Sequence, residues 1–234
     1  MNKTRLFRLA FRWLPRLPRP LVRAGADLAA LLVWAVATGT RRRVRANLAH
    51  LPTLAANPAA LDRATRRTFR SLLLNYVDLF IPPPPGIVRS IVIRNIGAFR
   101  AVQAEGQGII LVGMHTSSFE WGQYALQEFI ARPIIAPVES LQPSELFDLV
   151  LTERGKSGIR FLPISEGATL REMIAALRRG ENVLVELDRD VVQTGVVMPF
   201  FGAPARIPTG PIALARLTGA TLVLLSLWRD AHDH

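Results

Sequence analysis

From about residue 91 onward, short apolar runs of strand length alternate with segments of helical periodicity. The runs of strand length are residues 91–93, 109–112, 134–135, 183–187, 196–197 and 222–227. The clearest predicted helix covers residues 169–179 and is ended by Gly180. Its apolar stripe consists of Leu170, Met173, Ile174 and Leu177. This alternation predicts an α/β fold with a mostly parallel or mixed central sheet flanked by helices.

The basic charge of the chain is concentrated in its first hundred residues. Residues 1–100 carry 18 basic and 3 acidic side chains, whereas residues 101–234 carry 11 and 15. Because the α/β part is net acidic and has no nucleic-acid motif, we expect no nucleic-acid partner. The chain has no cysteine and four histidines that form no HExxH motif, so we expect no metal site.

The first 23 residues form a basic amphipathic pattern. Arginines recur at spacings of three and four between leucines and aromatic residues: Arg5, Arg8, Arg12, Arg16, Arg19 and Arg23. Such a pattern is typical of a helix lying in a membrane interface, and also of a solvated basic face packed on a domain. Pro15 limits the first helix to about the first fourteen residues.

The rest of the N-terminal part also reads as helical. Residues 28–37 are about ten apolar residues, fewer than the roughly 20 that span a bilayer, so we expect a buried or interfacial helix. Asn57 followed by Pro58 predicts a helix start. We therefore divide the chain into a basic helical, membrane-interface region (1–81), a proline-rich linker (82–90) and an α/β core (91–234).

His115 and Glu120 form the first candidate site. The apolar run 109–112 delivers His115 to a strand end, where sites gather in open α/β sheets, and Glu120 follows in what reads as the first turn of a helix. A nearby carboxylate suits a histidine that acts as a general base. The alternative is a capping box, with Ser117 as cap and Glu120 satisfying backbone donors, as also predicted for Thr169 and its partner three residues later.

A second polar block, Asp188-Arg189-Asp190, follows the run 183–187, so it reaches the same edge of the sheet as His115. Arg189 suits a phosphate or an anionic head group, and Asp188 can orient His115 or Arg189. The alternative is a charged loop that is paired internally. Phe200 and Phe201 come next, as the lining of a hydrophobic slot or as core residues.

Several ordered motifs resemble one known family. They are His115 and Glu120 as H-x4-D/E, Asp188-Arg189-Asp190, Pro199-Phe200-Phe201-Gly202, Pro208-Thr209-Gly210-Pro211, and Arg45-Ala46-Asn47-Leu48 followed by Pro52. Together they resemble the bacterial lysophospholipid acyltransferase superfamily, in the branch of lipid A late acyltransferases and phosphatidylinositol mannoside acyltransferases. Members often carry Gly-Asn-Trp where this chain has Ser117-Ser118-Phe119. The chain also ends earlier than such proteins usually do, as a C-terminal truncation would.

The resemblance implies an O-acyltransferase of lipid or glycolipid biosynthesis. A fatty acyl group would pass from an acyl carrier protein or coenzyme A thioester to a lipid or glycolipid hydroxyl, with no further cofactor. His115 would be the general base and Glu120 its partner. The expected substrate-binding residues are Asp188, Arg189, Asp190, Phe200, Phe201 and Arg154. The expected place is the cytoplasmic face of the inner membrane, where the protein would be peripheral or monotopic. An acyl-ester hydrolase with the same pair and a non-catalytic protein that binds anionic lipid are the alternatives.

Overall fold

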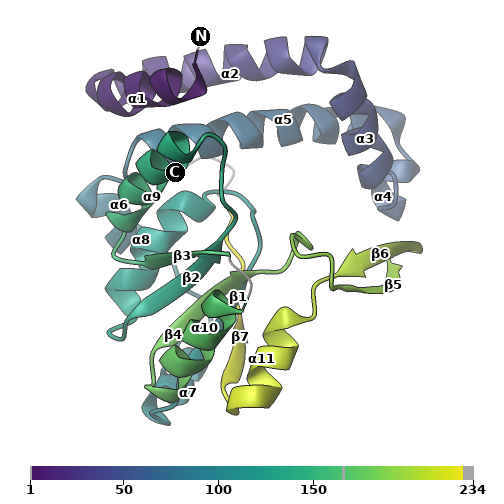
Figure 1. Cartoon of the computed structure of the whole chain (residues 1–234). Coiled ribbons are helices and arrows are strands. Elements are labelled where there is room, and N and C mark those ends of the chain that lie inside the picture. The colour runs from purple at the N-terminus through teal and green to yellow at the C-terminus, as the bar shows by residue number, and fades with distance from the viewer. Residues whose placement is uncertain (1, 165–166, 229–234) are drawn as a thin grey trace. The chain divides into compact units, whose positions relative to one another are not determined.

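The computed structural model describes residues 2–164 and 167–228 (Figure 1). Two compact units are present, and each is described by itself. The helical unit comprises residues 9–82 and 197–205, and the α/β unit comprises residues 1–8, 83–196 and 206–234.

The N-terminal helices follow the capping and proline signals of the sequence. They are α1 (Lys3–Trp13), the 3₁₀ turn η1 (Leu14–Arg16), α2 (Arg19–Val36), α3 (Thr38–Leu48), α4 (Pro52–Ala55) and α5 (Pro58–Phe80). Helix α1 ends two residues before Pro15, as predicted. The Asn57 side chain accepts a hydrogen bond from the Ala60 backbone amide at 3.0 Å, which caps α5 where the sequence predicted its start.

Helix α2 contains residues 28–36 of the apolar run, and Ala37 is its C-cap. It buries the small side chains of Ala26 and Ala30, while Leu28, Leu32 and Val36 are more than half exposed. No single described helix is both long and apolar enough to cross a membrane. The bent pair of α2 and α3, which meet at 94°, meets that criterion together by length and composition alone.

The α/β unit is built on a five-stranded parallel sheet with the order β3-β2-β4-β1-β7 (Figure 1). Its strands are β1 (Ile109–Gly113), β2 (Ile134–Val138), β3 (Arg160–Pro163), β4 (Asn182–Glu186) and β7 (Thr221–Leu224). Its helices are α6 (Pro85–Ser90), α7 (Ile96–Ala104), α8 (Phe119–Phe129), α9 (Ser144–Gly155), α10 (Ala168–Arg178) and α11 (Gly210–Thr218). The α/β fold predicted from the sequence is therefore confirmed.

Both faces of the sheet are covered, because alternate residues of each strand point to opposite faces. Ile110 and Val112 of β1 pack with residues of α10 and α11 on one face. Ile109 and Leu111 pack on the other face, in a cluster that α7 and α8 complete with Phe99, Val102 and Leu126. The chain therefore leaves β1 toward α8 on one face and reaches α11 on the opposite face after β4. This topological switch point is where an open α/β sheet places its ligands, at the carboxyl ends of the strands.

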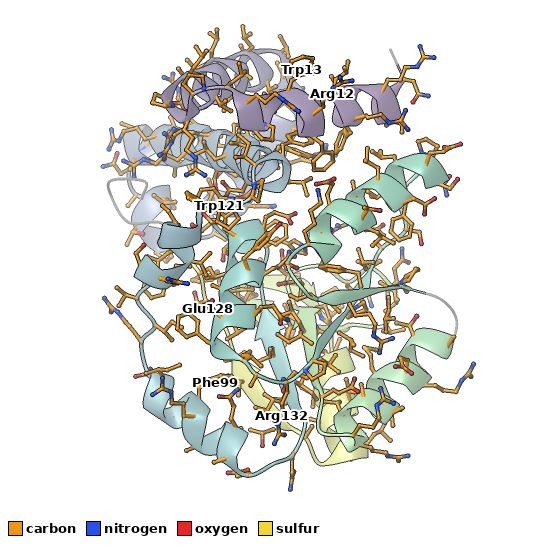
Figure 2. All side chains as sticks on the ribbon, turned by 90° about the vertical axis from the view of Figure 1, so that its left-hand side faces the viewer. Arg12, Trp13, Phe99, Trp121, Glu128 and Arg132 are labelled. Atoms are coloured by element: carbon orange, nitrogen blue, oxygen red, sulfur yellow. The ribbon has the colours of Figure 1, made fainter. Side chains whose placement is uncertain are left out.

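The amino edge of the sheet is fastened by Arg132, which is labelled in Figure 2. One guanidinium nitrogen, Nη1, donates to the carbonyl oxygens of Gly106, Gln107 and Gly180 at 2.7, 3.1 and 3.2 Å. These carbonyls precede β1 and β4, so Arg132 holds the entrances of the two central strands together.

The proline-rich segment of residues 82–90 contains helix α6. Two local predictions were wrong, and two strands were missed. Residues 91–93 form no strand. The capping box at Thr169 does not form, because α10 begins one residue earlier and the Thr169 hydroxyl donates to the Pro163 carbonyl at 2.6 Å. The missed strands are β3 and β6 (Ala203–Ile207). Strand β6 forms a two-stranded sheet with β5 (Val196–Phe200).

Candidate active site

The pairing of β1 with β4 brings His115 and Asp188 together. In the parallel register Gly113 lies opposite Glu186. His115 and Asp188 each follow two residues later along the chain. His115 Nδ1 lies 2.9 Å from Asp188 Oδ1, and the His115 backbone amide donates to the same oxygen at 3.2 Å. The structure therefore contains the contact between Asp188 and His115 that the sequence suggested.

This hydrogen bond determines which ring nitrogen is available for chemistry. Asp188 accepts as a carboxylate, so Nδ1 carries the proton in the neutral ring and Nε2 holds the lone pair. The His115 side chain is 36% exposed, so solvent or a substrate can reach the ring. Asp188 thus sets the tautomer that a general base requires.

The electrostatic surroundings make His115 a stronger base. Its pKa is raised above the ordinary value chiefly by the hydrogen bond to Asp188, with further contributions from the charges of Asp188 and Glu186, while burial and Arg154 act in the opposite direction. Burial acts to raise the pKa of Asp188, but the hydrogen bond and charge of His115 outweigh it and leave that pKa lowered.

Among the described residues no hydrogen bond or ion pair joins Glu120 to His115, unlike the direct pair expected from the sequence. Its buried carboxylate is instead held by the Arg154 guanidinium, with Nε 3.2 Å from both carboxylate oxygens and Nη2 in contact with Oε1. The exposed fractions of the Arg154 and Glu120 side chains are 20% and 6%, so the ion pair is largely shielded from water. Arg154 lies 34 residues further along the chain, on α9, and this separation hid the pair from sequence reasoning.

Phe119 links this ion pair to the histidine. Its ring meets His115 edge to face with centroids 4.8 Å apart, and the Arg154 guanidinium carbon lies 5.8 Å from the Phe119 centroid. A series of contacts therefore runs from Glu120 through Arg154 and Phe119 to His115.

The capping box predicted at Ser117 is wrong. Helix α8 begins at Phe119, its cap residue is Ser118, and no side chain caps it. Ser117 instead adopts φ +50°, a left-handed conformation that glycine accepts more readily. Glu120 does lie in the first helical turn, as predicted.

Glu186 is a site residue that sequence reasoning missed, because it was counted as part of a strand. Its Oε2 is buried without a hydrogen-bond partner in the described residues, and burial raises the pKa of its carboxyl group. A Cβ on Gly113 would lie 2.8 Å from that oxygen, so glycine is what makes room for it. The one signal in the sequence was an acidic residue at the end of an apolar strand.

A divalent cation would find three suitable ligand types here. His115, Glu186 and Asp188 offer ligand atoms within 4.8 Å of one another. The observed use of His115 Nδ1 is the hydrogen bond to Asp188, which competes with coordination by that nitrogen. In this arrangement the cluster suits acid–base chemistry, with Nε2 of His115 as the ring nitrogen left for a proton.

The two remaining members of the second polar block have different surroundings. Arg189 is 60% exposed and pairs with Glu139 at 3.0 Å. Asp190 turns inward and accepts from the backbone amides of Thr194 and Gly195 at 3.2 and 2.9 Å. Asp190 therefore shapes its own loop, in agreement with the alternative of an internally bonded charged loop, whereas Arg189 keeps an exposed guanidinium.

Phe200 and Phe201 lie at the turn between β5 and β6. Their side chains are 57% and 54% exposed, and their rings meet edge to face with centroids 4.7 Å apart. As described, the two rings line no enclosed slot, and they are not core residues either. Helix α11 begins at Gly210 with Pro211 in its first turn, and the Thr209 side chain, at the N-cap position, makes no cap hydrogen bond.

A histidine that is hydrogen-bonded to an aspartate at the switch point of a parallel α/β sheet is an arrangement that suits general-base chemistry. The family profile described as bacterial lipid A biosynthesis acyltransferase matches residues 5–234. The chain therefore belongs to this family, as the sequence motifs suggested.

Named relatives are consistent with that assignment. A phosphatidylinositol mannoside acyltransferase of Mycobacterium tuberculosis (strain CDC 1551 / Oshkosh) is 29% identical over 182 residues, which cover 76% of this chain and 54% of that protein. A lipid A biosynthesis lauroyltransferase of Escherichia coli (strain K12) is 34% identical over 146 residues, covering 60% and 45%. The chain thus spans about half the length of the curated relatives it matches.

Proposed function

We propose that this protein transfers a fatty acyl group from an acyl thioester to a hydroxyl group of a membrane glycolipid. The proposal rests on membership of the lipid A biosynthesis acyltransferase family and on the hydrogen bond between His115 and Asp188. The two named relatives act on phosphatidylinositol mannoside and in lipid A biosynthesis, so the proposed acceptor is a glycolipid of that general kind.

In the proposed reaction His115 Nε2 removes the proton of the acceptor hydroxyl while its oxygen attacks the thioester carbonyl carbon. The tetrahedral intermediate then expels the thiolate, which recovers the proton from the imidazolium. One ester forms, one thioester breaks and no acyl-enzyme is needed, which suits a chain without cysteine. Asp188 stabilises the imidazolium between the two proton transfers.

Glu120 is proposed to act as a positioning residue. Its ion pair with Arg154 fixes the guanidinium beside Phe119, and the Phe119 ring rests against His115. The H-x4-E spacing would then support the base through packing, while Asp188 makes the direct hydrogen bond.

The donor is proposed to be an acyl carrier protein or coenzyme A thioester. Both donors carry phosphate groups. Arg189 is the proposed contact, because its guanidinium is 60% exposed although it pairs with Glu139. Nε and Nη2 of Arg154 already donate hydrogen bonds to Glu120, so Arg154 is a weaker candidate for the phosphate contact. Phe200 and Phe201 supply exposed apolar area for an acyl chain.

The protein is proposed to work on the cytoplasmic face of the inner membrane as a peripheral or monotopic protein. Arg12 lies 5.4 Å from the Trp13 ring centroid and Arg16 lies 5.5 Å from it, and the two residues Arg12 and Trp13 lie side by side on α1 in Figure 2. Leu9, Trp13 and Leu17, which lie close to these arginines along the chain, are each 44–53% exposed. Exposed apolar side chains flanked by arginine suit a surface of anionic lipid.

An acyl-transfer assay tests the proposal. The protein is incubated with a radiolabelled acyl thioester, and mannosylated phosphatidylinositol or a lipid A precursor is either added or omitted. The proposal predicts labelled glycolipid and little free fatty acid. Equal release of free fatty acid with and without acceptor would instead identify a hydrolase that uses the same histidine.

A further inference from the structure

We propose that the helical unit contains a binding site for a phosphate ester, in a cavity between α2, α3 and α5. The cavity has a volume of about 300 Å³. Its lining residues are Trp34, Arg41, Arg42, Arg45, Asp62, Thr65 and Arg66. All of them belong to the helical unit, so the site is defined without reference to His115.

The helical periodicity of the sequence gathers these residues. Arg41 and Arg45 are one turn apart on α3, and Asp62 and Arg66 are one turn apart on α5, so each helix turns one face toward the cavity. Arg45 begins the Arg-Ala-Asn-Leu motif, to which the acyl-transfer site assigns no role.

The charge of the cavity is not balanced by the protein. Arg45 pairs with Asp62 at 3.2 Å. Within the described part of the chain no carboxylate forms an ion pair with Arg41, Arg42 or Arg66. Three guanidinium groups around one cavity repel one another, and an anion bound among them would remove that repulsion.

Trp34 holds two of these arginines in place. The guanidinium carbons of Arg41 and Arg66 lie 4.7 and 4.4 Å from the Trp34 ring centroid, and Arg41 Nη1 donates to the Trp34 carbonyl at 2.9 Å. Stacking restricts both side chains before any ligand arrives, so less conformational entropy is lost on binding. The site is therefore built in advance, unlike arginines that extend freely into solvent.

One residue of the cavity lining also carries an unsatisfied donor. The indole Nε1 of Trp34 is buried and lacks a hydrogen-bond partner among the described residues. Buried donors of this kind are normally satisfied. A phosphate ester supplies several acceptor oxygens, and its geometry matches the planar guanidinium fork.

The same chemistry has two sources: the head group of an anionic phospholipid, or a soluble phosphate ester. Isothermal titration calorimetry on the full chain at constant ionic strength separates them, with inorganic phosphate in one arm and dihexanoyl phosphatidylglycerol below its micelle concentration in the other. Saturable binding of one ligand per chain is expected in at least one arm. Tighter binding of the lipid identifies a head-group site, and similar affinities identify a site for soluble phosphate.

Matched variants test whether this cavity is responsible. Arg41→Gln/Arg66→Gln is expected to weaken binding by at least about tenfold, because two charge-assisted contacts are lost. Arg63→Gln/Arg67→Gln removes the same charge from α5 outside the cavity and is expected to change the affinity less than about twofold. Arg41→Lys/Arg66→Lys keeps the charge but loses the planar guanidinium group, so it too is expected to weaken binding. This lysine pair replaces the glutamine pair in the test if circular dichroism shows that the glutamine pair is unfolded.

Three results would overturn the site. They are no saturable binding of either probe, equal losses in the cavity and control variants, and a folded Arg41→Gln/Arg66→Gln protein that binds like the wild type. Because no acyl donor is present, none of these results bears on acyl transfer, and loss of acyl transfer would not bear on this site.

Discussion

The backbone amide and the ring Nδ1 of His115 both donate to one oxygen of Asp188, at 3.2 and 2.9 Å. This double contact follows from the parallel register of β1 and β4, which sets Gly113 opposite Glu186. The segments that follow the two strands, with His115 and Asp188, are therefore close together. A single carboxylate oxygen thus fixes the position of the histidine backbone and the tautomer of its ring.

Replacing Asp188 is expected to affect both the rate and its pH dependence. Asp188→Asn keeps the shape but favours the wrong tautomer, so kcat/KM for acyl transfer should fall by about 10² or more. A general base works when unprotonated, so activity rises with pH through the pKa of His115. Because Asp188 raises that pKa, its loss should move the rise to lower pH.

The measurement for Asp188 is kcat/KM from about pH 5 to 9, a range that brackets the ordinary histidine pKa. Asp148→Asn, an exposed residue of α9, is the control and should leave the profile unchanged. An Asp188→Asn protein with the wild-type rate and profile would exclude this residue as the partner of His115.

The Glu120–Arg154 pair is expected to contribute to stability as a unit. Removing either partner strands a shielded charge, so Glu120→Gln and Arg154→Gln should each lower the free energy of unfolding by about 3 kcal/mol. The double variant should lose clearly less than the sum, because neither charge is then left alone. Urea unfolding measures all four proteins, and strictly additive losses would show that the pair is not coupled.

Ser117→Gly is expected to stabilise the protein. A serine at φ +50° pays for its Cβ with strain of about 1 kcal/mol, partly offset by the greater chain entropy of unfolded glycine. The thermal midpoint should therefore rise modestly. Ser118→Gly, at φ −94°, serves as the control and should not raise it; the reverse ranking would show that the Ser117 conformation carries no strain.

Membrane attachment is expected to depend on α1 and the turn that follows it. Each basic residue near an anionic surface contributes about 1 kcal/mol, so Arg12→Gln/Arg16→Gln should weaken binding to phosphatidylglycerol vesicles by about tenfold or more at low salt. Arg171→Gln/Arg178→Gln on α10 removes equal charge and should have little effect in a vesicle sedimentation assay. Equal effects of the two pairs would attribute binding to net charge alone.

Much of the fold could be predicted because its signals are local. The cap at Asn57, the break at Pro15 and the apolar run of β1 each act within a few residues of the chain. Strand β3 was not predicted, because Arg160 and Pro163 give its sequence the composition of a loop. It lies at the edge of the sheet, where a strand tolerates proline.

The site was predictable only in part. His115 and Asp188 could be placed at the same sheet edge, because parallel strands end together. The partner of Glu120 could not, because Arg154 arrives from α9 and its approach depends on how α8 and α9 pack. Spacing alone therefore suggested a direct His115–Glu120 pair, whereas in the described structure the two side chains are hydrogen-bonded to Asp188 and Arg154.

The central claim is that His115 is the general base of an acyl transfer. The most direct test compares wild type and His115→Ala in acceptor-dependent transfer of a labelled acyl group to glycolipid, with circular dichroism to verify the fold. We expect the rate to fall by about 10²–10⁴ in a folded His115→Ala protein. A folded His115→Ala protein that transfers the acyl group at the wild-type rate would contradict the claim.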